Sequence, residues 1–194
     1  KLIGEAEDSA ASLAFIKSAF SLALLLMFIV LISLFNNFYH TFIILFSIVL
    51  STTGIFVGLL VMGMSFSGVM TGLGIVACTG IVVNNNIILI DSYRKIRKVE
   101  EDKIVAIIKS ARSRIRPIFL TTITTVCGLL PSALQISMNI FDRSITYKSP
   151  ETYFVQPLAW AIVWGLSFAT FATLFVTPAL LALPDRIKSL VSKN

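Results

Sequence analysis

Charged residues are scarce in this sequence, and that scarcity excludes most soluble folds. Only 13% of the 194 residues are charged, whereas 56% are hydrophobic, and a typical soluble domain carries about twice that share of charge. The net charge of +6 does not indicate nucleic-acid binding, because so apolar a chain cannot surround its core with a polar surface. The composition instead predicts a protein whose solvent is the lipid bilayer.

Histidine and cysteine are equally scarce. His40 is the only histidine, and Cys78 and Cys127 lie inside apolar runs without a CxxC spacing. A metal site built from several histidines or cysteines is therefore not expected, and both cysteines are interpreted as small packing residues. The sequence predicts neither an enzyme nor a bound cofactor.

Long apolar runs are what the sequence has in abundance. Five of them approach or exceed the roughly 20 residues that a helix needs to cross a bilayer. They are Ser18–Phe35, Thr41–Met64, Gly68–Asp91, Pro117–Gln135 and Phe154–Leu183. The expected fold class is all-α, a polytopic membrane protein with five transmembrane helices. The acidic start of the chain lacks the basic region of a signal peptide, so we expect a piece of a longer protein.

Basic residues indicate how these helices are oriented. The connection 92–116 holds nine of the 16 lysines and arginines, so the positive-inside rule places it in the cytoplasm. Residues 1–17 then form a periplasmic lead-in, residues 136–153 a periplasmic loop, and residues 154–194 the last helix and a cytoplasmic tail. This assignment gives 12 basic residues inside and 4 outside. Apolar residues recur within 92–116 every three or four positions, which predicts one amphipathic helix on the cytoplasmic membrane surface.

A few polar residues at bilayer depth are the candidate functional groups. Asn84, Asn85 and Asn86 are consecutive and cover about 200° of a helix, so at least one must face a protein interior. Counting by three and four from Asn84 gives Ala77 and Gly80 before it and Asp91 after it. This small and polar stripe favours Asn84 as the interior amide, with Asp91 at its foot. The alternative is that the asparagines only hold helices together.

The fourth span carries a second polar stripe. Thr121, Thr124 and Thr125 follow helical spacing and lie at about the same depth as Asn84, so the two stripes are candidates to line one hydrated path. The alternative is that each threonine bonds to its own helix. Arg114 lies at the inner rim below Thr121. Snorkelling to the membrane surface is the alternative for both Arg114 and Asp91.

Small residues indicate where helices approach one another. Gly54 and Gly58 in the second span, and Gly68 and Gly72 in the third, have the GxxxG spacing. This spacing is typical of close helix packing in membranes rather than of chemistry.

Three motifs follow one another along the chain. They are GIVVNNNIILIDSYRK, RSRIRPIFLTTITTVCGLLP and GLSFATFATLFVTPALLAL, beginning at Gly80, Arg112 and Gly165. In this order they resemble the C-terminal membrane half of resistance-nodulation-division (RND) exporters, the AcrB-like proteins. The resemblance implies helices eight to twelve of a twelve-helix multidrug efflux transporter in the bacterial inner membrane. It implies protons as the coupling ion, paired aspartates and periplasmic porter domains in the missing N-terminal half, and a homotrimer working with a membrane-fusion protein and an outer-membrane channel.

The same resemblance assigns residue roles. The family's relay lysine falls on Asn84, the following asparagine on Asn85, the relay threonine on Thr121 and the inner-rim arginine on Arg114. Because Asn84 replaces the lysine, this chain departs from the family pattern, and an uncharged amide has to take the place of an ammonium. The alternatives are a non-catalytic membrane anchor or assembly module, and a SecD/SecF-like protein-export helper.

Overall fold

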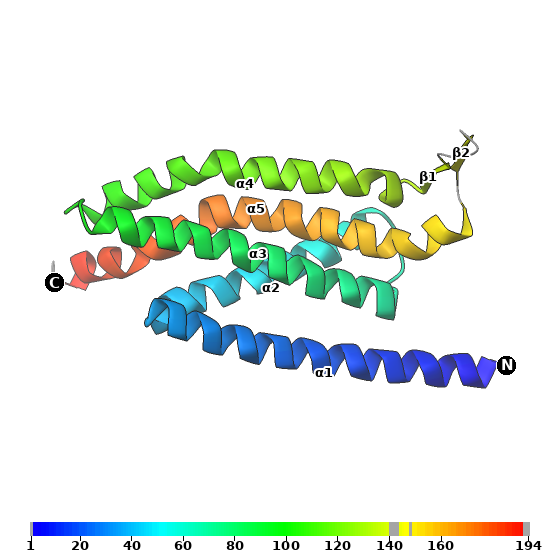
Figure 1. Ribbon diagram of the computed structural model, residues 1–194. Coiled ribbons are helices and arrows are strands. Elements are labelled where there is room, and N and C mark those ends of the chain that lie inside the picture. The colour runs from blue at the N-terminus through cyan, green and yellow to red at the C-terminus, as the bar shows by residue number, and fades with distance from the viewer. Residues whose placement is uncertain (1, 140–143, 148, 192–194) are drawn as a thin grey trace.

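The computed structural model describes the backbone of residues 2–139, 144–147 and 149–191, and the side chains of residues 10–137, 147, 149–150 and 152–184. Five long helices account for most of the chain (Figure 1). They are α1 (Leu2–Phe35), α2 (Phe38–Val61), α3 (Gly68–Arg97), α4 (Lys103–Ala133) and α5 (Pro150–Val191). Each contains a stretch long and apolar enough to cross a membrane, so the all-α polytopic fold is confirmed.

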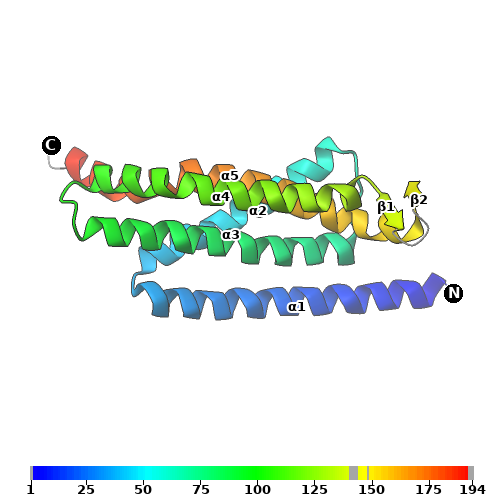
Figure 2. The same ribbon diagram turned by 45° about the horizontal axis from the view of Figure 1, so that its top comes forward.

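The helices run alternately up and down between two ends. One end, the hairpin end, carries the N-terminus and a small β-hairpin; the other, the basic end, carries the α3–α4 turn and the C-terminus (Figures 1 and 2). The hairpin pairs β1 (Ile136–Asn139) with β2 (Ser144–Tyr147) in antiparallel register, Ile136 opposite Tyr147. These two strands were not expected from the sequence.

Asparagine chemistry makes the first tight turn. Asn36 ends α1 in the left-handed region with φ 46°, a conformation that asparagine tolerates better than most residues. The next residue, Asn37, caps α2, because its side-chain oxygen accepts a hydrogen bond from the Tyr39 backbone N–H at 2.9 Å. This cap satisfies one of the N–H groups that a helix start leaves without an internal partner.

The connection 92–116 differs from the separate surface helix that was expected. α3 continues to Arg97, and α4 begins at Lys103 and runs without a break through Pro117. The turn between them is closed by Arg97, which donates to the Glu100 and Glu101 carbonyls. Residues 103–116 are helical and amphipathic, but they extend α4 along the bundle (Figure 1). Their buried face, Ala106, Ile107 and Ser110, packs inward.

α5 is the central helix, in contact with α2, α3 and α4, whereas α1 lies at the edge against α2 and α3. Close packing depends on glycine: a Cβ added at Gly54 would lie 2.3 Å from Phe168 Cβ, and one at Gly58 would lie 2.1 Å from Trp164 Cγ. α2 therefore lies directly on α5 at these positions. Gly68 and Gly72 face α1, beside Leu13 and Ile16 respectively.

Reaction of introduced cysteines with a membrane-impermeant thiol reagent tests the orientation. Val99 is 90% exposed in the turn at the basic end, and Ser65 is exposed in the α2–α3 connection at the hairpin end. In the full-length protein without other reactive cysteines, reagent added outside the cell should label Ser65→Cys and not Val99→Cys, because basic segments stay in the cytoplasm. Labelling of Val99→Cys alone would reverse the assigned orientation.

Candidate functional site

One contact sets the register between α3 and α4. The hydroxyls of Ser92 and Ser113 lie 3.4 Å apart. Eight residues from each serine toward the hairpin end, about 12 Å along each helix, are Asn84 on α3 and Thr121 on α4. One residue in the same direction reaches Asp91 and Arg114. The predicted polar residues of the two helices therefore form two tiers, which we call the upper tier (Asn84 and Thr121) and the lower tier (Asp91 and Arg114).

Asn84, the amide that the sequence favoured as the interior group, does not point into this five-helix bundle. Its side chain is exposed, whereas Asn85 and Asn86 are buried. The stripe found by helical counting is real, but it is the open side of α3: Ala77, Gly80, Asn84 and Ile88 are all exposed. Helical spacing identified residues that share a face without identifying what covers that face.

Asn86 is the amide that the bundle encloses. Its Nδ2 donates to the Val82 carbonyl at 3.0 Å and to Thr173 Oγ1 at 3.1 Å. Its Oδ1 accepts a hydrogen bond from Thr177 Oγ1 at 2.9 Å. Both donors and the acceptor of the amide are thus used, and α3 is tied to α5 inside the apolar core. The signal missed in the sequence was the pair Thr173 and Thr177, one helical turn apart on the last span.

Neighbouring threonines of α4 divide between two faces. Thr121 is exposed and its Oγ1 donates to the Ile118 carbonyl at 2.9 Å within its own helix. Thr122 is buried, and its hydroxyl lies 2.7 Å from the Thr170 hydroxyl on α5. Thr124 is exposed and bonds to the Leu120 carbonyl of its own helix. Thr121 and Thr124, together with the exposed side of α3 around Asn84, form what we call the open face. Thr122 belongs to the α4–α5 interface.

The lower tier surrounds a cleft at the basic end. Asp91, Arg94 and Arg114 line this space of about 520 Å³ together with apolar side chains of α1 and α3. Asp91 is paired with Lys95 at 2.7 Å, and Arg94 lies over the Phe35 ring at 5.6 Å. Arg114 Nε is buried without a hydrogen-bond partner among the described residues. An arginine donor left unpaired at a protein-lined cleft is suited to a further acceptor from outside the chain.

The open face differs from the rest of the exposed surface. Elsewhere, many exposed residues of the spans are large and apolar, such as Phe42 at 64% and Leu60 at 81%, which suits contact with lipid. The open face carries glycine, amide and hydroxyl groups, whose exposure to hydrocarbon is costly. Its composition is that of a surface covered by protein or lining a hydrated path. Asn85 does not belong to it.

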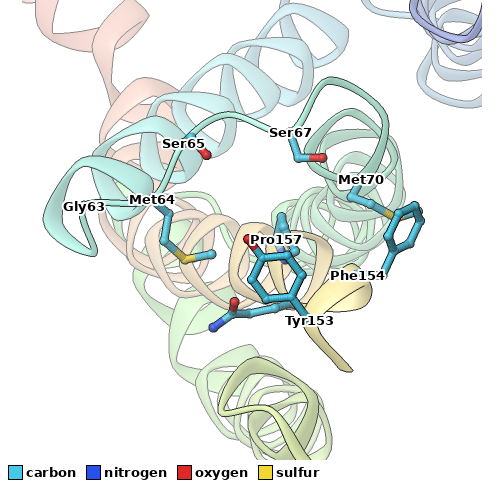
Figure 3. A pocket seen from close by; sticks show the side chains of 9 residues that line it. Gly63, Met64, Ser65, Ser67, Met70, Tyr153, Phe154 and Pro157 are labelled. Atoms are coloured by element: carbon cyan, nitrogen blue, oxygen red, sulfur yellow. The ribbon is translucent and has the colours of Figure 1, made fainter. Parts of the chain in front are cut away.

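A separate pocket of about 430 Å³ lies at the hairpin end (Figure 3). Met64 and Met70 border it from opposite sides, with Ser65 and Ser67 on the α2–α3 connection and Tyr153 and Pro157 on α5. Among the side chains that the structure describes, no charged one lines it. Within the described residues, no group of three or more histidines, cysteines, aspartates or glutamates is arranged to hold a metal ion.

These features define a segment of a multi-pass membrane protein in which the five helices leave one polar face uncovered. The chain belongs to the AcrB/AcrD/AcrF family, which it matches over residues 2–184, and it is a fragment of an RND transporter. It is 27% identical to the cobalt-zinc-cadmium resistance protein CzcA of Cupriavidus metallidurans over 84% of its length. It is 30% identical to the swarming motility protein SwrC of Bacillus subtilis over 90% of its length.

The fold is shared with a solved heavy metal efflux pump, crystal form II. The TM-score is 0.75 at 29% identity, covering 93% of this chain and 16% of that one. The chain likewise spans 14% of CzcA and 16% of SwrC. Most of the length of such transporters therefore lies outside this chain.

Replacement of Asn86 tests the enclosed cluster. In the full-length protein, Asn86→Leu should lower resistance to denaturation by sodium dodecyl sulfate by about 1–2 kcal/mol, because two interhelical hydrogen bonds are lost at about 0.6 kcal/mol on average each and buried threonine hydroxyls lose their partner. Thr53→Val is the control, since Thr53 is exposed and bonds only to the Val49 carbonyl of its own helix. Equal unfolding curves for the two variants would contradict the role of Asn86.

Proposed function

We propose that this chain is one half of the membrane domain of a proton-driven RND exporter in the bacterial inner membrane. The observation that carries the proposal is the open face, where Asn84 and Thr121 stand level above Asp91 and Arg114. A polar face at bilayer depth needs a protein partner. The missing half of the transporter, with its paired aspartates, is the partner that the family membership supplies.

The upper tier is where this chain meets those carboxylates. Asn84 has an exposed amide with two donors, so it can donate a hydrogen bond to an ionised carboxylate and accept one from a protonated carboxyl. It cannot itself bind or release a proton near neutral pH. The protons are therefore carried by the aspartates, and Asn84 responds to their charge without supplying a positive charge of its own.

Thr121 supplies a hydroxyl at the same level. Its bond to the Ile118 carbonyl uses the hydroxyl proton and leaves the oxygen lone pairs free to accept a hydrogen bond. Rotation about the Cβ–Oγ bond would turn the same proton toward a facing carboxylate. Thr121 is thus able to donate or accept as a partner changes its protonation state.

The lower tier holds positive charge near the basic end. Arg114, whose buried Nε has no hydrogen-bond partner among the described residues, lines a cleft together with Arg94 and Asp91. With the basic end in the cytoplasm, protons leaving the upper tier would pass this cleft. Asp91 is a relay candidate there, held ready by its exposed ion pair with Lys95.

Cargo selection and assembly are proposed to lie outside this chain. The relatives include a cobalt-zinc-cadmium resistance protein, a nickel and cobalt resistance protein and a swarming motility protein, and their sequence identities to this chain are similar. That pattern is explained if these relatives share the proton-coupled membrane domain and differ in the domains that bind the cargo. A divalent metal cation is the cargo that most of these names support, and the trimeric assembly with membrane-fusion and outer-membrane partners is proposed with it.

Substitution at Thr121 tests the relay role. In the full-length exporter, Thr121→Ala should abolish proton-coupled efflux at normal protein abundance, because the hydroxyl is removed, while Thr121→Ser should keep much of the activity. Thr53→Val serves as the control for loss of a hydroxyl that bonds only within its own helix. Near-native efflux by Thr121→Ala would contradict the relay role and mean that the hydroxyl only bonds within its own helix.

A lysine at position 84 tests the amide. In Asn84→Lys the ammonium would favour the ionised form of a facing aspartate and lower its pKa by about 1–3 units. Protons are then held less firmly, so the pH optimum of efflux should move to lower pH. Asn84→Leu should depress efflux and Asn84→Gln should preserve it.

The anchor alternative predicts a different result for the same series. If this membrane half only anchors the protein, then an unshifted pH profile for Asn84→Lys and intact efflux for Asn84→Leu are expected. That outcome would also remove the upper tier from the proton path.

A further inference from the structure

The face of α4 turned toward α5 carries a groove that the proton path does not use. Its α4 wall includes Phe119, Ile123 and Cys127, and its α5 wall includes Phe171 and Phe175, around a space of about 420 Å³. Phe119 and Phe171 are more than half exposed. Cys127 is exposed as well, so it is not the packing residue that was expected.

The floor of the groove contains two threonines, but their hydroxyl groups are already hydrogen-bonded within the protein. Thr122 and Thr170 meet there, with hydroxyls 2.7 Å apart, and each also contacts the carbonyl four residues before it. The hydrogens of both hydroxyls are used in these hydrogen bonds, so neither threonine has a donor left for an occupant of the groove. The groove is about 12 Å long from Phe119 to Cys127, lies within apolar spans, and offers an occupant mainly hydrocarbon contacts.

Positive charge continues the same face toward the basic end. Arg116 and Arg112 precede Phe119 by three and seven residues, which places them on one side of α4 in line with the groove. Both are exposed, and no ion pair joins either to another described residue. An apolar groove ending at two unpaired arginines is complementary to a molecule with a hydrocarbon chain and an anionic head.

We propose that this groove binds one anionic glycerophospholipid, with an acyl chain between α4 and α5 and its phosphate at Arg112 and Arg116. A covering segment of the transporter is the other conceivable occupant. The polar residues of α4 that require such a covering, Thr121 and Thr124, lie on the side of the helix away from the groove. Two arginines facing the headgroup region favour lipid. This inference does not depend on the proton relay.

Native mass spectrometry of the purified full-length transporter tests the site. The protein is delipidated in detergent and titrated with phosphatidylglycerol or with phosphatidylcholine of the same acyl chains. Wild type should retain one phosphatidylglycerol in preference to phosphatidylcholine. Arg112→Gln/Arg116→Gln should weaken that binding about thirtyfold, because each arginine near the membrane surface contributes about 1 kcal/mol toward an anionic lipid. Lys95→Gln/Lys98→Gln removes the same charge at the C-terminal end of α3 and should not weaken that binding.

A second pair of variants tests the groove without changing charge. Ile123→Trp fills the space and should displace the bound lipid, whereas Leu120→Trp, an exposed position outside the groove, should not. Unchanged phosphatidylglycerol binding in both Ile123→Trp and the double arginine variant would overturn the proposal. That result would assign the groove to a covering segment of the transporter.

Discussion

A polar group in the hydrocarbon region of a membrane must find its partner within protein or hydrated space, and the arrangement of this chain follows from that constraint. The bundle satisfies one polar set internally: Asn86, Thr173 and Thr177 close on one another between α3 and α5. It leaves a second set open, with Asn84 and Thr121 level on the uncovered side of α3 and α4. The closed set holds the helices in register, and the open set is available to the rest of the transporter.

The two roles share one helix because adjacent residues of a helix point in different directions. Asn84 and Asn86 are separated by about 200° around α3, so one amide faces outward while the other is buried against α5. Thr121 and Thr122 divide α4 in the same way, and the groove beside Thr122 lies away from the polar face. α3 and α4 thus each have one side packed against α5 and one open side. Close packing at Gly54 and Gly58 holds α2 against the central helix α5.

The five spans could be predicted from the sequence because the length and apolarity of a membrane helix are local properties. The equal depth of Asn84 and Thr121 was also predictable, and the Ser92–Ser113 contact agrees with it. The burial of Asn86 rather than Asn84 was not, because periodicity defines a face but does not identify its neighbour. The continuity of α4 through Pro117 was missed for a similar reason, since basic residues at the membrane surface are compatible with either a surface helix or an extended span.

We propose that protein, not lipid, covers the open face in the complete transporter. Nitroxide labels at Asn84→Cys and Thr121→Cys in the full-length protein, reconstituted in vesicles, report contact with lipid through collisions with dissolved oxygen, and a label at Leu60→Cys gives the lipid-exposed reference, because Leu60 is 81% exposed in an apolar span. If protein covers the open face, oxygen accessibility is low at positions 84 and 121 and high at position 60. Equal, high accessibility at all three positions would place the polar face in lipid and contradict the account.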